Sequence, residues 1–233
     1  MTMQTRRTSG DGTEGSLPAQ ILEQQEHFDF GPARPLVREP HSGERKRVLE
    51  VMGRAFFDDP VSMYLFPDER KREAGFAAFT GLAIDAFGAS GLVLTNDAVQ
   101  GAAVWQRPSP NPSSALAQLR MGLRMLWISG RRFREAARLG DFMSKHHLRD
   151  PHYYLATLGT DPSHQRKGIG SALIQPVLER CDKERVPAYL ESSKRANIPF
   201  YNKHGFEVIE EIEVPGGPKL WPMIRQPGQA LTR

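Results

Sequence analysis

The chain has 233 residues, of which 39% are hydrophobic and 25% are charged, a composition typical of one globular domain. Its single cysteine excludes an internal disulfide and is typical of a reducing compartment. No apolar run approaches the roughly 18 residues that a membrane span needs, and the start lacks the apolar segment of a secretory signal. We therefore expect a cytoplasmic protein without a membrane partner.

The net charge of +4 weakly favours anionic partners. Much of the positive charge lies in 120–138, which holds six arginines. The helical spacing of Leu116, Leu119, Leu123 and Leu126 predicts a helix with a buried leucine face and a solvated arginine face. Nucleic-acid binding is the alternative, but no recognition motif accompanies the charge. We expect no nucleic-acid partner.

Composition also divides the chain into a domain and two tails. Residues 1–32 are rich in Gly, Ser, Gln and Glu and have few apolar side chains, so we expect a disordered tail there. The domain is expected to span 33–227, and 228–233 to form a short C-terminal tail.

The first half of the domain shows alternating strand and helix signals. The expected elements, in chain order, are a short strand at 33–40, a helix at 42–59 capped by Ser42, an irregular stretch at 60–69, a helix at 70–87, a hairpin at 91–108 turning at Asn96 and Asp97, and helices to about 148.

The last third begins with a strand at 153–160 that is apolar on both faces and is therefore expected in the centre of a sheet. Gly159 within it indicates a bulge or a close backbone approach. A helix is expected at 168–183, where Pro176 removes a hydrogen bond and predicts a kink. Cys181 lies on the apolar stripe of this helix, so we expect it in the core.

Another strand at 186–193 precedes a short helix with clear boundary residues. Asn197 suits its N-cap, Pro199 its first turn, and Gly205 a left-handed end. The chain closes with a predicted hairpin at 206–225. Strands and helices in this alternation predict an α/β domain with a mixed sheet.

A glycine turn, "HQRKGIG" at 164–170, joins the central strand to the following helix. A Walker loop is excluded because Lys167 precedes Gly168, and a dinucleotide fingerprint is excluded because Leu173 stands where the third glycine belongs. The remaining pattern is Q/R-x-x-G-x-G/A. Unpaired N–H groups and the positive end of the helix dipole would receive a pyrophosphate there.

This strand, turn and helix, followed by "NIPFYNKHGF" at 197–206, resembles the GNAT superfamily of N-acetyltransferases, and more narrowly puromycin N-acetyltransferase and its relatives. The segments at 154–176, 186–193 and 213–228 carry the narrower likeness, with a looser match before Tyr153. The resemblance implies a single GNAT-type domain with a mixed sheet of about seven strands. The sheet would be splayed at an acetyl-CoA site and flanked by helices. Acetyl-CoA would be the cosubstrate, and no metal is expected.

The resemblance also implies roles for individual residues. Tyr201 would be the acid that protonates the departing thiolate, and Glu191 would be the base that takes a proton from the amine. Asn197 would contact the pantetheine, unless it only caps its helix. The backbone of Leu158, Gly159 and Thr160 would serve the pantetheine arm and the thioester. The pyrophosphate would be wrapped by Gln165, Arg166, Lys167, Gly168, Ile169, Gly170 and Ser171.

The resulting hypothesis is an acetyl-CoA-dependent N-acetyltransferase that acts on the amine of a small molecule, such as an aminonucleoside or an antibiotic-like amine. Two alternatives remain open: a non-catalytic acetyl-CoA-binding sensor or scaffold, and a protein N-acetyltransferase. We expect the arginine-rich segment at 120–138 to line or cover the acceptor site. His146, His147 and His152 lack a metal-ligand spacing and are expected at the surface.

Overall fold

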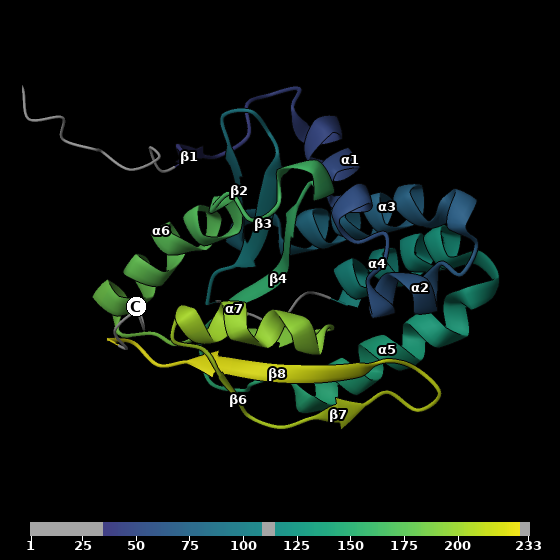
Figure 1. The fold of residues 1–233 in the computed structure, drawn as a ribbon. Coiled ribbons are helices and arrows are strands. Elements are labelled where there is room, and N and C mark those ends of the chain that lie inside the picture. The colour runs from purple at the N-terminus through teal and green to yellow at the C-terminus, as the bar shows by residue number, and fades with distance from the viewer. Residues whose placement is uncertain (1–34, 109–114, 229–233) are drawn as a thin grey trace, which may run out of the picture. The chain divides into compact units, whose positions relative to one another are not determined.

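One mixed sheet organises the residues that the computed structural model describes, which are 35–108 and 115–228, with the backbone alone for 115–120. Its order is β1-β2-β3-β4-β5-β8-β6, and β7 pairs with β8 (Figure 1). The predicted α/β fold with a mixed sheet flanked by helices is confirmed. The strands are β1 (Val37–Arg38), β2 (Gly91–Asn96), β3 (Gly101–Gln106), β4 (Tyr153–Thr160), β5 (Ala188–Ser192), β6 (Glu207–Val208), β7 (Ile212–Glu213) and β8 (Lys219–Arg225).

Helices cover both faces of this sheet. One hydrophobic cluster joins α6 to β2–β5 and β8, whereas another joins α1 to the opposite face of β3. A third cluster holds α5 against α2, α3 and the β7–β8 hairpin. The helices are α1 (Arg45–Ala55), α2 (Pro60–Leu65), α3 (Glu69–Phe87), α4 (Ala115–Ser129), α5 (Phe133–His146), α6 (Ile169–Glu184) and α7 (Ile198–Lys203).

The sheet splays between its two central strands. β4 and β5 run parallel but pair only at Tyr153–Ala188 and Tyr154–Tyr189. On their outer edges, β5 pairs with β8 from Ala188 to Ser192 and β4 pairs with β3 as far as Thr160, so each strand keeps one partner where the two separate. The β5-facing backbone groups of β4 beyond Tyr154 are therefore left for a ligand, because a strand offers hydrogen-bonding groups at both edges.

Two irregularities shape β4. The register with β3 shifts between Val104 and Trp105, where Ala156 is the extra residue, so the bulge lies three residues before Gly159. At Gly159 itself a Cβ would lie 2.9 Å from the Cβ of Ala55 and 2.9 Å from the sulfur of Met52. Glycine is thus required there because the backbone of β4 lies directly against α1.

Two sequence predictions near the N-terminus are wrong. Ser42 does not cap the first helix: α1 begins at Arg45 after Glu44, whose carboxylate instead binds Arg38 at 2.7 Å. The stretch expected to be irregular contains α2. Asp59 caps α2 by accepting a hydrogen bond from the N–H of Val61 at 2.9 Å.

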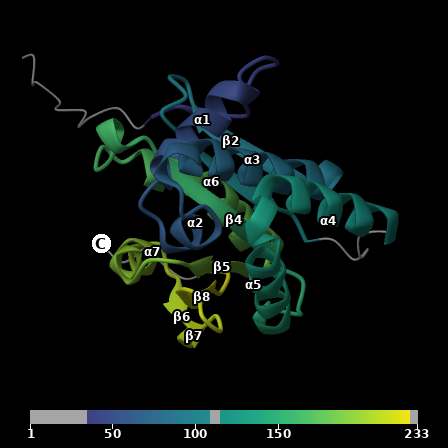
Figure 2. The ribbon, with the colours of Figure 1, turned by 90° about the vertical axis from the view of Figure 1, so that its right-hand side faces the viewer.

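The leucine face predicted for α4 is also wrong. Leu123 is 59% exposed and Leu126 is 46% exposed. The half-buried Met125 and Ile128 pack against the third cluster instead, because α4 lies on the side of α3 away from the sheet (Figure 2). The side chains of Leu116 and Leu119 lie outside the described residues, as does the tail at 1–32.

Predictions for the last third agree more closely with the structure. Helix α6 continues through Pro176, and Cys181 is fully buried, which raises the pKa of its thiol to about 12. Gly205 adopts the expected left-handed conformation with φ +81° after α7. Asn197 occupies the N-cap position of α7, but its side chain makes no capping hydrogen bond.

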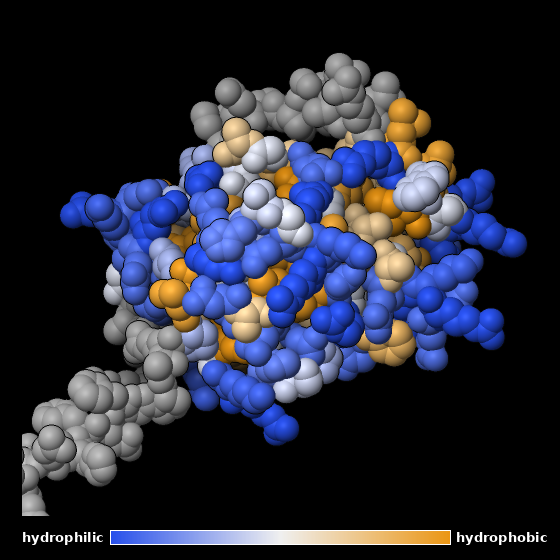
Figure 3. Space-filling view, turned by 90° about the horizontal axis from the view of Figure 1, so that it is seen from above, coloured by the Kyte–Doolittle hydropathy of each residue, from blue (hydrophilic) through white to orange (hydrophobic). Residues whose placement is uncertain are grey.

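Hydrophilic side chains dominate the face seen in Figure 3, and apolar ones form smaller patches among them. Within 35–108 and 115–228, no helix has the length and hydropathy needed to cross a bilayer.

A buried ion pair ties the last strand to α6. Arg225 on β8 is 2% exposed, and its guanidinium donates two hydrogen bonds to the carboxylate of Asp182 at 2.7 and 2.8 Å. Asp182 also accepts one from the N–H of Gly228 at 2.7 Å. The bonds from Arg225 lower the pKa of the Asp182 carboxyl.

We expect Asp182→Asn to lower the free energy of unfolding by about 2–3 kcal/mol, because it removes the charge of the carboxylate that accepts two hydrogen bonds from the buried Arg225 guanidinium, while water still reaches position 182. Since the folded-state pKa of Asp182 is lowered, its contribution is present above the unfolded value of about 4 and is lost as the pH falls through the folded value. Urea unfolding at pH 7 and at pH 3 measures both effects. Asp141→Asn, which breaks an exposed pair with Lys145, is the control and should change stability by less than about 0.5 kcal/mol. An equal effect of the two variants would contradict the assignment.

Candidate active site

A cleft of about 650 Å³ opens where β4 ends, between the N-terminus of α6, α7 and the α1–α2 connection. It brings together most of the residues that the sequence assigned to the cosubstrate, and also Tyr201. Lys167 and Glu191 do not line it. The sequence-predicted residues that do are Leu158, Gly159, Thr160, Gln165, Arg166, Gly168, Ile169, Gly170, Ser171, Asn197 and Tyr201.

The glycine turn has the backbone geometry of an anion site. Gly168, at φ +79°, holds the N-cap position of α6 without a side-chain cap, and the N–H of Ala172 is the first to bond back, to the Gly168 carbonyl at 3.0 Å. The N–H groups that precede it have no partner within the helix. A Cβ at Gly168 would meet no atom within 4 Å, and Gly168 to Ser171 line the cleft, so the turn borders open space.

The charges around the turn are arranged to favour an anion. Arg166 and Lys167 are exposed at its rim. The carboxylate of Asp161, at the end of β4, accepts hydrogen bonds from Ser163 and from Arg54 at 2.8 Å, which together lower its pKa to about 2. Because Asp161 is paired, it does not cancel the positive rim. This pattern suits a pyrophosphate.

Tyr201 lies on α7 with its ring between those of Phe200 and Phe206, at centroid distances of 5.1 and 5.9 Å. Tyr201 is only 8% exposed, and its hydroxyl makes no hydrogen bond to the described residues. Burial raises the pKa of Tyr201, and the negative charge of Asp59 raises it further. The hydroxyl therefore stays protonated and free to donate into the cleft.

The sequence reasoning missed the acidic pair Asp58 and Asp59, which lines the cleft with Lys194. Asp59 is 3% exposed and accepts a short hydrogen bond from Ser193, which follows β5, while burial raises the pKa of its carboxyl. Asp58 pairs with Lys194 at 2.6 Å. The signal was present in the sequence: Asp59 before Pro60 is an N-cap followed by a first-turn proline.

Glu191 points to a second group of side chains, on the face of the sheet opposite α6. Its side chain is 3% exposed, and Oε1 lies 3.2 Å from Nδ1 of His147, which follows α5. The hydroxyls of Tyr154 and Tyr189 also lie near this carboxylate, whose charge adds to burial in raising the pKa of both phenols.

The three histidines expected at the surface are each partly exposed, and two of them also take part in a side-chain cluster. His147 lies 3.2 Å from His152, Nε2 to Nε2, and its ring contacts those of Tyr154 and Tyr189 at centroid distances of 4.7 and 5.1 Å. These residues meet because the segment after α5 leads directly into β4. His146 instead bonds back to the Phe142 carbonyl within α5.

The arginine-rich segment does not line the cleft with any of its described side chains. Arg124 pairs with Asp85 at 2.7 Å, Arg132 donates to the Tyr64 carbonyl at 2.8 Å, and Arg138 reaches the Pro215 carbonyl at 3.4 Å. We expected the arginine-rich segment to line or cover the acceptor site. Its described arginines instead hold elements together or face solvent, and none of them lines this cleft.

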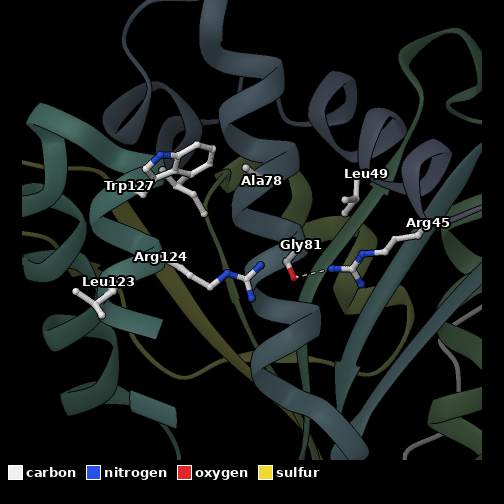
Figure 4. A pocket seen from close by; sticks show the side chains of 8 residues that line it. Arg45, Leu49, Ala78, Gly81, Leu123, Arg124 and Trp127 are labelled. Carbon is white, nitrogen blue, oxygen red and sulfur yellow. Dashed lines mark hydrogen bonds between the residues drawn. The ribbon is translucent and has the colours of Figure 1, made fainter. Parts of the chain in front are cut away.

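A smaller hollow of about 340 Å³ lies between α1, α3 and α4, with Arg45 and Arg124 at its sides (Figure 4). Both arginines bind Asp85, at 2.6 and 2.7 Å, and Arg45 also donates to the Gly81 carbonyl. The remaining lining is mainly apolar and includes Trp127, which is 84% exposed. It shares no residue with the cleft and offers no group suited to proton transfer.

Comparison with known sequences gives the family. A model of the Acetyltransferase (GNAT) family matches residues 127–206. An uncharacterised N-acetyltransferase of Schizosaccharomyces pombe is 32% identical in an alignment 199 residues long, which covers 78% of this chain and 79% of the relative. N-alpha-acetyltransferase 50 of Danio rerio is 36% identical in an alignment 61 residues long, which covers 24% of this chain and 36% of that protein.

Solved structures with the same fold include a histone acetyltransferase HPA2 and related acetyltransferase from Corynebacterium glutamicum. It is 21% identical, with a TM-score of 0.60, over 85% of this chain and 99% of that one. Arylalkylamine N-acetyltransferase 2 from Aedes aegypti is 13% identical, with a TM-score of 0.52, over 82% and 98%. The chain belongs to the GNAT family of acetyltransferases, enzymes whose acetyl donor is acetyl-CoA.

Proposed function

We propose that this enzyme transfers the acetyl group of acetyl-CoA to the amine of a small molecule by direct attack on the thioester. The observation that carries the proposal is the position of the acidic groups. Asp59 and the Glu191 side chain are each 3% exposed, and Glu191 and Ser193, the hydrogen-bond partner of Asp59, both follow the last β4–β5 pair. A small, slender amine can reach carboxylates that are this deeply buried, whereas the surface of a folded protein reaches them less easily.

The donor side of the cleft is suited to the pantetheine and pyrophosphate of acetyl-CoA. The residues from Gln165 to Ser171 would wrap the pyrophosphate, with backbone N–H groups as donors and Arg166 and Lys167 adding charge at the rim. Ser171 would contribute through its N–H, because its hydroxyl already contacts Nε2 of His204 at 3.0 Å. Asn197, whose side chain caps nothing, would contact the pantetheine.

At the thioester, two kinds of donor would act. The backbone N–H groups of β4 between Leu158 and Thr160 would stabilise the oxyanion that develops when the amine attacks the carbonyl carbon. Tyr201 would donate to the sulfur as the carbon–sulfur bond breaks. Its raised pKa keeps the hydroxyl available as a donor over the whole neutral range.

Glu191 would act as the base that removes a proton from the attacking amine. It lies two residues beyond the last β4–β5 pair and two residues before Ser193, the partner of the cleft residue Asp59. Two strand residues span about 7 Å, so one bridging water would connect the carboxylate to an amine in the splay.

Two substrate classes compete within this proposal. The likeness of the last third to puromycin N-acetyltransferase favours an aminonucleoside or a similar antibiotic-like amine. The 61-residue likeness to N-alpha-acetyltransferase 50 of Danio rerio gives a protein N-terminus as the alternative acceptor.

A thiol-release assay separates these classes. The purified enzyme is incubated with acetyl-CoA and, in parallel, with aminonucleosides, arylalkylamines, polyamines, and peptides that carry a free N-terminus or a lysine. We expect turnover with at least one small amine and a kcat/KM for it that exceeds every peptide value. A peptide that outperforms every small amine would establish protein acetylation instead.

A further inference from the structure

A chain of hydrogen bonds leads from the buried Glu191 to the surface. Nδ1 of His147 lies 3.2 Å from Oε1 of Glu191, Nε2 of His147 lies 3.2 Å from Nε2 of His152, and Nδ1 of His152 lies 2.7 Å from the Asp150 carbonyl. Side-chain exposure rises along this series of hydrogen bonds, from 3% at Glu191 to 32% at His147. His152 then connects the chain to the exposed loop at 149–151.

The three contacts fix how many protons the chain holds. A carbonyl only accepts, so Nδ1 of His152 carries a hydrogen. Between the two Nε2 atoms one nitrogen carries a hydrogen and the other does not. If His152 is neutral, His147 donates from Nε2, and its Nδ1 then faces Glu191. That contact is a hydrogen bond only if either Glu191 or Nδ1 of His147 is protonated.

The remaining arrangement places the proton on His152, after which His147 accepts at Nε2 and donates from Nδ1 to the Glu191 carboxylate. Three protonation patterns therefore satisfy all contacts, and they differ only in whether the extra proton lies on Glu191, His147 or His152. Such a chain conducts a proton, since each transfer reverses only the hydrogen bond in which it occurs and leaves the other bonds made. Burial lowers the pKa of His152, so the proton does not stay at the outer end.

We propose that Glu191, His147 and His152 form a proton relay that carries the proton released by the acceptor amine from the active site to solvent. This inference rests on the proposed function. An alkylammonium loses two protons on becoming an amide: the carbon–nitrogen bond forms, the carbon–sulfur bond breaks, and the leaving sulfur takes one proton by way of Tyr201. One proton per turnover is left over and must leave the site.

The groups around the relay are suited to this role. Tyr154 from β4 and Tyr189 from β5 face the Glu191 carboxylate, and both have a raised pKa, so they remain neutral donors. The Tyr189 hydroxyl donates its one hydrogen to the His146 carbonyl at 3.3 Å, so Tyr154 is the phenol that donates to Glu191. The other charges that act on the cluster are those of Asp150, near His152, and Glu210, near Tyr189. Among the described residues, no cluster of His, Cys, Asp or Glu has the arrangement of a metal site.

Chemical rescue tests the relay. Turnover of the best small amine is measured in dilute, non-conducting buffer and again with added imidazole, for the wild type, His147→Gln and His152→Gln. Glutamine keeps a polar side chain but does not titrate. We expect kcat of both variants to fall by roughly 10²-fold in dilute buffer, the lower end of the range for proton transfer, and to recover with imidazole. Acetyl-CoA affinity and thermal stability should stay near the wild-type values.

His146→Gln is the matched control, because His146 adjoins His147 but its ring bonds back within α5. It should turn over at the wild-type rate with no response to imidazole. The relay is refuted if His152→Gln keeps the wild-type kcat in dilute buffer, or if its lost activity does not return with imidazole, which would indicate a structural role. A wild type that acetylates no small amine refutes the proposed function instead, so the two failures are distinguishable.

Discussion

Tyr201→Phe is expected to lower kcat by roughly 10²–10⁴-fold, the usual value of a positioned general acid. The change removes only a hydroxyl that lines the cleft and bonds to no described residue, so the ring packing between Phe200 and Phe206 stays intact. Because the lost interaction is made only as the sulfur departs, kcat and kcat/KM should fall together, while acetyl-CoA affinity is unchanged. Steady-state kinetics and calorimetry measure these quantities.

Tyr64→Phe is a matched control for this variant. The Tyr64 hydroxyl is also buried and has no partner among the described residues, but it does not line the cleft. Its removal should leave turnover at the wild-type value. If Tyr201→Phe behaves in the same way, the sulfur is protonated by water or by another residue, and Tyr201 is a core tyrosine.

The pH profile gives a second check on Tyr201. Burial and the charge of Asp59 raise its pKa above the ordinary value of about 10, so the hydroxyl keeps its proton throughout the neutral range. The wild-type kcat should therefore show no decline from loss of this proton as the pH rises from 7 to 9.

The part of the site that the sequence predicted depends on short-range signals. The segment from β4 through the glycine turn to α6 combines an apolar strand, a left-handed glycine and an amphipathic helix within about thirty residues, and each of these signals is local. The same holds for α7, with Pro199 in its first turn and Gly205 after its end. Local signals determine the backbone conformation of a short segment. An anion site made of backbone N–H groups at a helix N-terminus needs only that conformation, so the sequence predicts it.

The misses have a different cause. The spacing of the α4 leucines is helical, but spacing does not say which side of a helix meets the core, and the second apolar stripe through Met125 and Ile128 is the one that packs. In the same way, His147 and Glu191 are 44 residues apart, and only the pairing of β4 with β5 brings them together. A polar cluster whose members come from different elements produces no periodic pattern in the sequence, so the sequence does not predict it.

The splayed sheet relates the glycine turn, which local signals predicted, to the Glu191–His147 cluster, which they did not. β3 pairs with β4 from Tyr154 to Thr160, and β8 pairs with β5 along its whole length, whereas β4 and β5 pair with each other only at Tyr153–Ala188 and Tyr154–Tyr189. The glycine turn lies at the N-terminus of α6, and Glu191 and His147 lie on the face of the sheet opposite α6. In the proposed function, the donor would therefore bind at one face of the sheet and the proton would be removed at the other.

Gly168→Glu is expected to weaken acetyl-CoA binding by on the order of 10²-fold or more, since like charges brought together at a binding site are opposed by several kcal/mol. The new side chain would start from a position that has no neighbour within 4 Å, directly over the unpaired N–H groups of α6. Its carboxylate would occupy the pyrophosphate position and would itself be attracted by the helix dipole. Isothermal titration calorimetry on the folded variant measures the loss.

Gly168→Ala separates charge from backbone strain in this experiment. Both substitutions place a Cβ at φ +79°, where a non-glycine residue is disfavoured by about 1–2 kcal/mol, so both should lower the melting temperature by a similar amount. Only the glutamate adds charge and length. We expect the alanine variant to bind acetyl-CoA within about tenfold of the wild type, a difference of about 1.4 kcal/mol. Equal affinity of the glutamate variant and the wild type would mean that the pyrophosphate binds elsewhere, because a carboxylate at this position cannot share the α6 N-terminus with a second anion.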